Sequence, residues 1–365
     1  MQKIALLLSL LMVSASLSAQ YRFASVAEVG CTAVKNQERT GTCWSFSTCS
    51  FLESELMRLG KGQFDLSEMY VVKNIYLEKG QNYVLRQGKA NFGEGGLNHD
   101  FVRTVARHGI VPEEVYSGKL DPSKPFDHSE MVAALEGMLE KLTKRRSLSP
   151  NWKVAYEAVL DAYMGDWPEE FSYRGKTYTP LSFAQSLGLN PDDYVSLTSF
   201  SHHPFYGKFV LEIPDNFSNE SYFNLPLDEL QAIVDYAIAQ GYTIAWDGDV
   251  SEKNFSPKEG IALLPADPSR EDRYDQPGKE IAVDQNNRQA EFESYATTDD
   301  HLMHIVGIVK DQAGTKYYKI KNSWGKIGDL EGFLYMSEAY FRMKTVGIMV
   351  HKSAIPRDIA GKIEL

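Results

Sequence analysis

The stretch that decides the fold is Val34-Lys-Asn-Gln-Glu-Arg-Thr-Gly-Thr-Cys-Trp-Ser-Phe-Ser47. Before Cys43 the chain shows no sustained hydrophobic period, whereas from Cys43 to Leu59 apolar residues recur at steps of three and four, as on one face of an α-helix. The stretch therefore predicts an irregular lead-in and a helix that begins at Cys43 and ends before Gly60. Free N–H groups and the helix dipole stabilise an anionic sulfur at a helix N-terminus, so Cys43 is a candidate nucleophile with a lowered pKa.

Outward from this helix, the chain divides into a helical part and a part made of strands. A capping box at Asp65-Leu-Ser-Glu68 predicts a second helix through Ile75, and the stretch from Leu97 to His108 predicts a third. From about residue 242 onward, short runs rich in β-branched and aromatic residues predict strands. Helices first and strands last indicate an α+β fold with the site between the two halves.

These patterns predict one domain over residues 20–365. We expect a helical half at about 40–116, a large insertion at about 117–245, a barrel-like sheet half at about 242–350 and a C-terminal tail at 351–365. The insertion has helical periods of its own, and no internal repeat is visible in it.

The first nineteen residues have the layout of a secretory signal peptide. Lys3 precedes an apolar run from Ile4 to Val13, and small residues lead to Ala19. The apolar run is shorter than the ~20 residues that span a bilayer. We expect cleavage after Ala19, export of a soluble mature chain to the periplasm or the medium, and no membrane partner.

Charge and cysteine content narrow the class of protein further. The formal net charge of −11 repels phosphate backbones, which argues against a nucleic-acid partner. The three cysteines, Cys31, Cys43 and Cys49, are too few for a disulfide scaffold, and at least one of them is unpaired in a monomer. Pairing of Cys31 with Cys49 stays open.

The sequence gives only weak indications of a metal site. The pair His202-His203 has no further ligand at zinc-site spacing, and Asp247 and Asp249 lack the spacing of a calcium loop. We interpret the two aspartates as ordinary loop residues and expect no metal and no cofactor.

A second group of motifs lies near the C-terminus. It comprises Asp300-His-Leu-Met-His-Ile-Val-Gly-Ile-Val309 and Tyr317-Tyr-Lys-Ile-Lys-Asn-Ser-Trp-Gly325. Together with Gln37 and Cys43-Trp44, these segments resemble the papain family of cysteine peptidases, whose site combines a cysteine, a histidine and an asparagine.

The resemblance implies a role for each of the matching residues. Cys43 is the nucleophile, Asn322 orients the base, and the side-chain amide of Gln37 forms the oxyanion hole with the backbone N–H of Cys43. His304 directly precedes the apolar run of the strand, whereas His301 lies upstream of that run, so His304 is predicted as the base and His301 is the alternative.

Substrate contacts follow from the same resemblance. Gly95-Gly96 resembles the family's glycine pair, whose backbone pairs with a peptide as an added strand does; a plain glycine-rich turn is the alternative. Trp324 is expected to shield the histidine–asparagine hydrogen bond from water.

Spacing narrows the resemblance to one branch. Cys43 and His304 are 261 residues apart, against ~130–150 in papain and the cathepsins. Segments such as Asn224-Leu-Pro-Leu-Asp-Glu229 and Trp246-Asp-Gly-Asp-Val250 are similar to bleomycin hydrolases and bacterial aminopeptidase C. This implies a cysteine-type aminopeptidase acting on peptides.

The same branch implies a role for the C-terminal tail. In that family the tail enters the cleft and restricts cleavage to free N-termini, so the Leu365 carboxylate is expected to bind the substrate's α-ammonium. Family members form hexamers, which makes a homo-oligomer an expectation here. An endopeptidase with an open cleft and a catalytically silent peptide binder are the alternatives.

Overall fold

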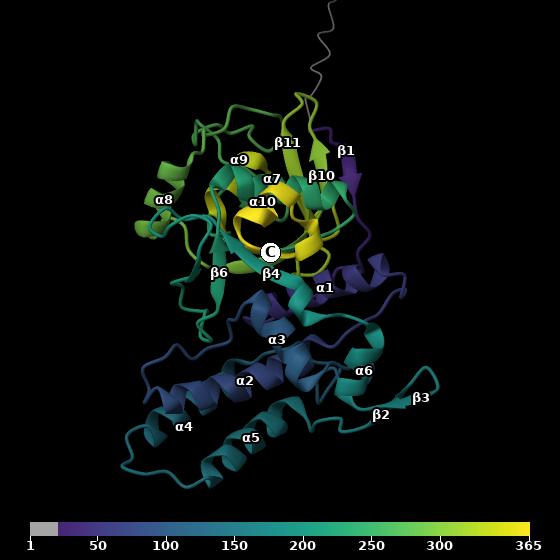
Figure 1. Ribbon diagram of the computed structural model, residues 1–365, viewed down its shortest axis with the longest axis vertical. Coiled ribbons are helices and arrows are strands. Elements are labelled where there is room, and N and C mark those ends of the chain that lie inside the picture. The colour runs from purple at the N-terminus through teal and green to yellow at the C-terminus, as the bar shows by residue number, and fades with distance from the viewer. Residues whose placement is uncertain (1–20) are drawn as a thin grey trace, which may run out of the picture.

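The computed structural model describes residues 21–365, so the predicted signal peptide lies outside the described residues. The chain folds into a helical half and a sheet half, which lie at the bottom and the top of Figure 1. Of the helices within residues 21–365, none is long and apolar enough to cross a membrane. The predicted α+β architecture is confirmed.

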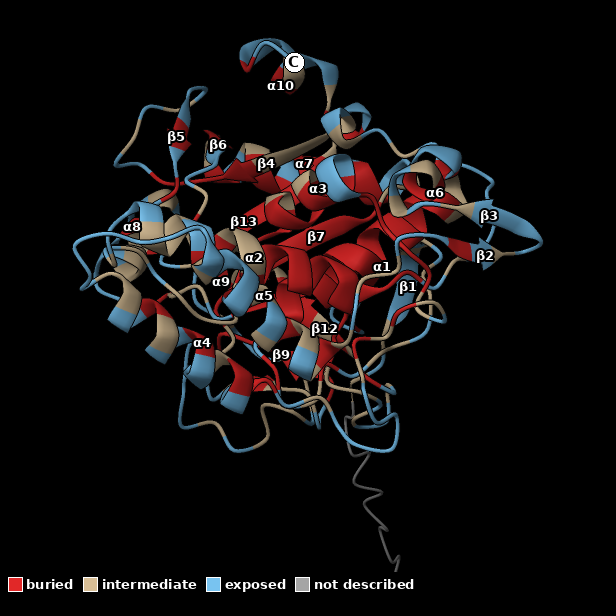
Figure 2. Cartoon of the chain, turned by 90° about the horizontal axis from the view of Figure 1, so that it is seen from below, coloured by how far each residue is buried: buried red, intermediate tan, exposed pale blue. Residues whose placement is uncertain are grey.

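The helical half is built around α1 (Cys43–Arg58), α2 (Glu68–Leu85) and α3 (Asn98–His108). Because α1 lies between the other helices and the sheet, it is buried on all sides along its first fourteen residues (Figure 2). The predicted capping box is displaced: Ser67, not Asp65, caps α2 by accepting a hydrogen bond from the N–H of Tyr70.

Residues 117–245 contribute to both halves. The helices α4 (Ser129–Leu142) and α5 (Asn151–Met164) pack against α2 and each other, and α6 (Pro180–Leu187) packs against α3. A short hairpin, β2 (Phe171–Tyr173) and β3 (Lys176–Tyr178), extends this half. The strands β4 (Tyr194–Thr198), β5 (Lys208–Val210) and β6 (Ser221–Asn224) join the sheet, and α7 (Leu227–Ala239) packs against it.

The remaining elements complete the sheet half. They are β1 (Ala24–Glu28), β7 (Ile244–Gly248), β8 (Phe255–Ser256), β9 (Ile261–Ala262), α8 (Gln285–Glu293), β10 (His301–Lys310), β11 (Lys316–Lys321), β12 (Phe333–Ser337), α9 (Glu338–Lys344), β13 (Thr345–His351) and α10 (Arg357–Lys362), with 3₁₀ turns at Pro191–Asp193 and Lys352–Ala354.

The strands form one eleven-stranded sheet in the order β5-β6-β4-β13-β7-β10-β11-β12-β9-β8, and β1 pairs with β10. Within the described residues this path does not return to its first strand, so the predicted sheet half is an open sheet and not a closed barrel. The strand β10 begins at His301, three residues earlier than the apolar run indicates, because residues 301–303 pair with β7.

The two faces of the sheet belong to different cores. Side chains alternate between faces along a strand. Leu302 of β10 and Ala245 of β7 therefore lie in the core shared with α1, whereas Met303 and Trp246 lie in the core shared with α7. The helical half and α7 thus cover opposite faces of the central strands.

Candidate active site

Cys43 is the first residue of α1, where the helical half meets the sheet. Its side chain is 8% exposed, and its sulfur accepts a hydrogen bond from the backbone N–H of Leu302 in β10. Burial raises the pKa of the Cys43 thiol to about 12, and the negative charges of Asp299, Asp215 and Asp247 add to the rise. The predicted lowering of this pKa by the helix N-terminus is therefore outweighed, because the sulfur has lost its contact with water.

His301, not His304, is the partner of Asn322. The Nε2 atom of His301 and Oδ1 of Asn322 are 2.7 Å apart, and both residues are buried. Trp324 covers the imidazole, with ring centroids 4.5 Å apart. Because Leu302 follows His301 directly and donates to the sulfur of Cys43, the histidine–asparagine pair lies beside the thiol.

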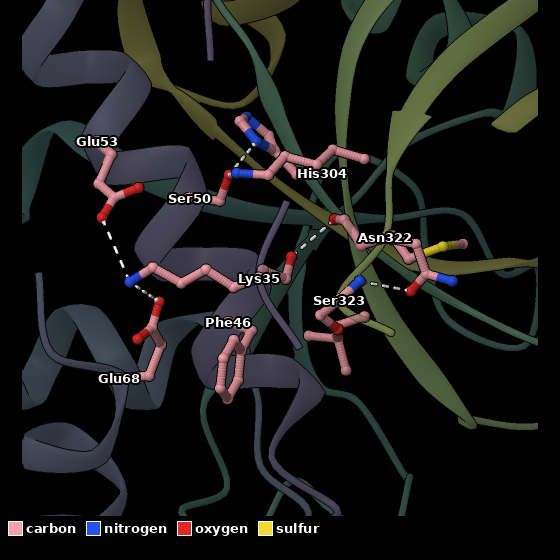
Figure 3. A pocket seen from close by; sticks show the side chains of 12 residues that line it. Lys35, Phe46, Ser50, Glu53, Glu68, His304, Asn322 and Ser323 are labelled. Atoms are coloured by element: carbon pink, nitrogen blue, oxygen red, sulfur yellow. Dashed lines mark hydrogen bonds and ion pairs between the residues drawn. The ribbon is translucent and has the colours of Figure 1, made fainter. Parts of the chain in front are cut away.

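The structure contradicts the prediction that His304 is the base. Its Nδ1 atom lies 2.8 Å from Oγ of Ser50 in α1, and Ser50 in turn accepts a hydrogen bond from Lys321. Figure 3 shows this imidazole directed at Ser50. Residues three apart on a strand point to opposite faces, so His304 faces α1 and is a core histidine.

Burial sets the protonation of both histidines. It lowers the pKa of His301 to about 4, despite the hydrogen bond that His301 donates to Asn322, and it lowers the pKa of His304 well below its usual value. The free site therefore favours a neutral imidazole next to a neutral thiol.

A partly buried polar cluster, in which Glu53 and Glu68 are buried and Asp65 is exposed, supports α1 beneath the site. Lys35 forms ion pairs with Glu53, Asp65 and Glu68, and a cavity of about 10 Å³ lies next to this cluster (Figure 3). That volume is close to the lower limit for holding one water molecule. The cluster fixes the lead-in segment to α1 and α2.

The other two cysteines are free thiols. Cys49 donates to Leu66 O, and burial together with Glu68 and Glu53 raises its pKa well above the usual value. Cys31 and Cys49 are therefore not paired, and a deeply buried thiol such as Cys49 is unreactive.

Gln37 lies between the lead-in and the Asn-Ser-Trp-Gly segment. Its Nε2 donates to Thr40 O at 2.7 Å, its Oε1 accepts from Ser323 Oγ at 2.6 Å, and its backbone N–H donates to Ser323 O. The amide is thus held rigidly next to the residue that follows Asn322.

The glycine pair forms a second wall of the site. A methyl group on Gly96 would lie 3.0 Å from the indole of Trp44, and one on Gly95 would overlap the carboxylate of Asp215. Lys79 donates hydrogen bonds to the carbonyls of Gly93 and Gly95. Only glycine fits between Trp44 and Asp215 here.

The C-terminal tail lies elsewhere, which contradicts the role predicted for Leu365. Ile355, Ile359 and Ile363 are buried in the core that contains α7, on the face of the sheet opposite to α1. Leu365 is 46% exposed, and its N–H donates to Ala360 O. In the part of the chain that the structure describes, the ion pairs of the tail go to Asp193 and Glu229 rather than to the site.

Three acidic residues near Cys43 were missed as site residues. Asp247 lies inside β7, not in a loop, and is paired across the strands with Leu302. Asp215 and Asp299 come from loops far apart in the sequence, so no local pattern identifies them. A signal was present only for Asp247, as a charged residue within an apolar strand run.

Glu212 is a partner of the two adjacent histidines that the sequence did not indicate. It lies 3.2 Å from His202 and 2.7 Å from His203 on the surface of the sheet half. Each imidazole is satisfied by this carboxylate, and the group lies outside the site at Cys43.

Comparisons with known proteins agree with this geometry. A model described as "Papain family cysteine protease" matches residues 19–160, and one described as "Peptidase C1-like family" matches residues 164–365. Aminopeptidase G of Lactobacillus delbrueckii subsp. lactis is 26% identical, over 89% of this chain and 82% of that protein. Cysteine proteinase 1, mitochondrial, of Saccharomyces cerevisiae is 24% identical, over 93% of this chain and 79% of that protein.

Among solved structures, PepW from Lactobacillus rhamnosis matches with a TM-score of 0.74 and 19% identity, over 93% of this chain and 84% of that chain. The similarity supports the same fold. The resemblance expected from the sequence is confirmed, since the Peptidase C1-like model covers more than half of the chain. This chain belongs to the Peptidase C1-like family of cysteine peptidases.

Proposed function

We propose that this chain is a cysteine-type aminopeptidase that cleaves the N-terminal residue from peptides. The observation that carries the proposal is the His301–Asn322 pair next to the sulfur of Cys43, which accepts the N–H of Leu302. Relatives named aminopeptidase G, W and E match this chain over 87–89% of its length. They support the exopeptidase class.

In the proposed reaction, the neutral pair becomes charged as the substrate reacts. The Cys43 thiol transfers its proton to Nδ1 of His301, the nitrogen that Asn322 does not use, while the sulfur attacks the scissile carbonyl. His301 then protonates the leaving amine, and a thioester to Cys43 remains. A water molecule that gives its proton to His301 attacks this thioester, and the proton returns to the sulfur as the N-terminal residue leaves.

The tetrahedral intermediate requires hydrogen-bond donors for its oxyanion. The amide nitrogen of Gln37 carries two protons, and one is used by Thr40 O. We assign the other to the oxyanion, together with the backbone N–H of Cys43 at the start of α1.

Cleavage of aminoacyl fluorophores, with and without an N-terminal acetyl group, tests the function. The proposal expects release from unblocked substrates only, abolished by Cys43→Ala. Equal release from blocked substrates would indicate an endopeptidase instead. A wild type that releases nothing under reducing conditions yet binds peptides would indicate the silent binder.

Export and assembly are further parts of the proposal. The hydrophobic N-terminal segment supports export with cleavage after Ala19, and the family resemblance supports a homo-oligomer, with a hexamer as the expected form. N-terminal sequencing of the mature protein and light scattering on the purified protein test the two points. An intact Met1 or a monomeric mass would contradict them.

A further inference from the structure

Asp247 is a buried carboxyl group whose hydrogen-bond partner is another carboxyl group, that of Asp299. Its side chain is 1% exposed, and within residues 21–365 no N–H group or hydroxyl donates to either of its oxygens. Two carboxyl groups can form such a hydrogen bond only when one of them is protonated, so the charged form of Asp247 has lost its hydration without a donor to replace it. A partner that donates protons and carries positive charge would stabilise the charged form of the pair.

The location of Asp247 connects it with the nucleophile. Asp247 is paired directly across the strands with Leu302, so both side chains lie on the same face of the sheet. That face packs against α1, as the contact of His304 with Ser50 two residues further along shows. Leu302 is also the residue whose N–H contacts the sulfur of Cys43. Asp247 therefore lies on the floor of the site, one strand away from Leu302.

Two half-buried carboxylates lie near Asp247. Asp299 acts most strongly on Asp247 among the surrounding charges, and one oxygen of Asp299 also lacks a partner. Asp215 contacts Gly95, in the segment predicted to bind the substrate backbone. Asp299 also lines an open, largely apolar pocket of about 440 Å³. Asp299 can thus be reached from solvent, whereas Asp247 is buried.

The cation that acts on these carboxylates already donates hydrogen bonds to other groups. Lys79 is the cation that acts on Asp215 and Asp299, but its ammonium donates to the carbonyls of Gly93 and Gly95. The negative charge of the three carboxylates therefore exceeds the positive charge that Lys79 supplies. Burial and this mutual repulsion raise the pKa of Asp247 well above its usual value and that of Asp299 to about 7.

We propose that Asp247, together with Asp215 and Asp299, binds the free α-ammonium group of the substrate and thereby restricts cleavage to the N-terminal residue. In an aminopeptidase the α-ammonium and the scissile carbonyl belong to the same substrate residue, so the acceptor must lie close to the nucleophile. Asp247 is paired with Leu302, whose N–H contacts the sulfur of Cys43, and the charges of all three carboxylates act on that sulfur. The tail, in contrast, packs on the other face of the sheet. An ammonium group supplies three donors and the missing charge.

This inference rests on the proposed aminopeptidase function, and its first test uses turnover. In Asp247→Asn the shape is kept and the charge is lost. We expect kcat/KM for an unblocked aminoacyl fluorophore to fall about 10- to 100-fold, mainly through KM, because a charge-assisted hydrogen bond is lost. Release from the acetylated substrate should stay at the background level expected of the wild type.

Two further variants guard against a folding artefact. Asp311→Asn removes another buried carboxylate, at the far end of β10, and we expect it to leave KM for the unblocked substrate unchanged. Asp299→Asn, at a half-buried position, should raise this KM, as Asp247→Asn does. An unchanged KM in both site variants would overturn the inference.

A binding measurement separates this inference from the proposed function. In the Cys43→Ala protein, calorimetry should show alanyl-alaninamide binding at least 10-fold more tightly than its N-acetyl form, and adding Asp247→Asn should abolish the difference. Retention of the difference would refute the ammonium site even if the wild type is an aminopeptidase. Loss of the difference would support the site whether or not the wild type turns over the fluorogenic substrate.

Discussion

Two histidines three residues apart in one strand have opposite roles because a strand alternates its side chains. His301 reaches Asn322 and is covered by Trp324, whereas His304 points into the core at Ser50. Both imidazoles are buried, so burial does not distinguish them; the difference is that His301 contacts Asn322 and His304 contacts Ser50 of α1.

Substitution of each histidine separates the two roles. We expect His301→Ala to lower kcat/KM by about 10³-fold or more, because the proton acceptor is lost. His304→Ala should keep activity within about tenfold and lower the free energy of unfolding by roughly 1–3 kcal/mol, since it removes one of the hydrogen-bond partners of Ser50 and leaves a cavity in the core. Peptidase assays and urea unfolding measure the two quantities. A larger loss of activity in His304→Ala than in His301→Ala would show that His304 is the base.

The pH dependence of thiol alkylation reports the resting state of Cys43. A thiol whose pKa is raised to about 12 is almost entirely protonated at pH 7, so its alkylation rate should rise about tenfold per pH unit from pH 6 to 9. Iodoacetamide labelling of a Cys31→Ser, Cys49→Ala protein isolates Cys43. A rate that is constant between pH 5 and 8 would show a preformed thiolate–imidazolium pair and contradict this expectation.

At the scale of elements, the tail acts as part of the sheet half. The turn at Lys352–Ala354 and α10 place Ile359 and Ile363 against the core that contains α7. In Figure 2, α10 lies on the outside of the molecule. Its contribution is therefore to stability, and access to the site is governed by groups around Cys43.

Deletion of residues 357–365 tests this placement. Removing Ile359 and Ile363 should lower the free energy of unfolding by about 4 kcal/mol, at ~2 kcal/mol for each buried side chain. Internal cleavage of an acetylated peptide should not appear. As a control, Lys362→Ala removes a surface side chain that pairs with Glu229 and lies over the ring of Tyr206, and it should leave the free energy of unfolding nearly unchanged. A gain of endopeptidase activity on deletion would show that the tail limits access to the cleft and would contradict this placement.

For the whole molecule, stability on acidification depends on buried imidazoles. His128, at the start of α4, packs against Tyr76 and Phe126, and burial lowers its pKa to about 4, although Asp127 opposes the shift. Because the folded pKa lies below the unfolded value of ~6.5, unfolding takes up a proton below pH 6.5. The stability contribution is present above that pH and is lost as the pH falls towards 4.

His128→Phe should therefore change the pH dependence of unfolding. Between pH 7 and pH 4.5 the wild type should lose roughly 2–3 kcal/mol more than the variant. Urea unfolding of both proteins at the two pH values measures the difference. Equal losses would show that His128 takes up its proton in the folded state.

The sequence by itself determined the elements whose physics is local. Hydrophobic period and end signals predict α1 from Cys43 to within a residue of its observed end, and they predict α3 and most strands of the sheet half. Spacing between motifs, together with the family resemblance, brought Cys43 and Asn322 to one site. These features depend on neighbours within a few residues or on motifs that can be compared directly.

Only the tertiary structure decided which histidine faces Asn322, where the tail lies and which carboxylates surround Cys43. The choice between His301 and His304 depends on where β10 begins, and β7 sets that point by pairing with residues 301–303. Asp215, Asp247 and Asp299 meet because a loop, a strand and another loop converge on α1. Pairing between distant strands and the burial that it creates cannot be read from local periodicity, because a one-residue change of register moves every side chain to the other face.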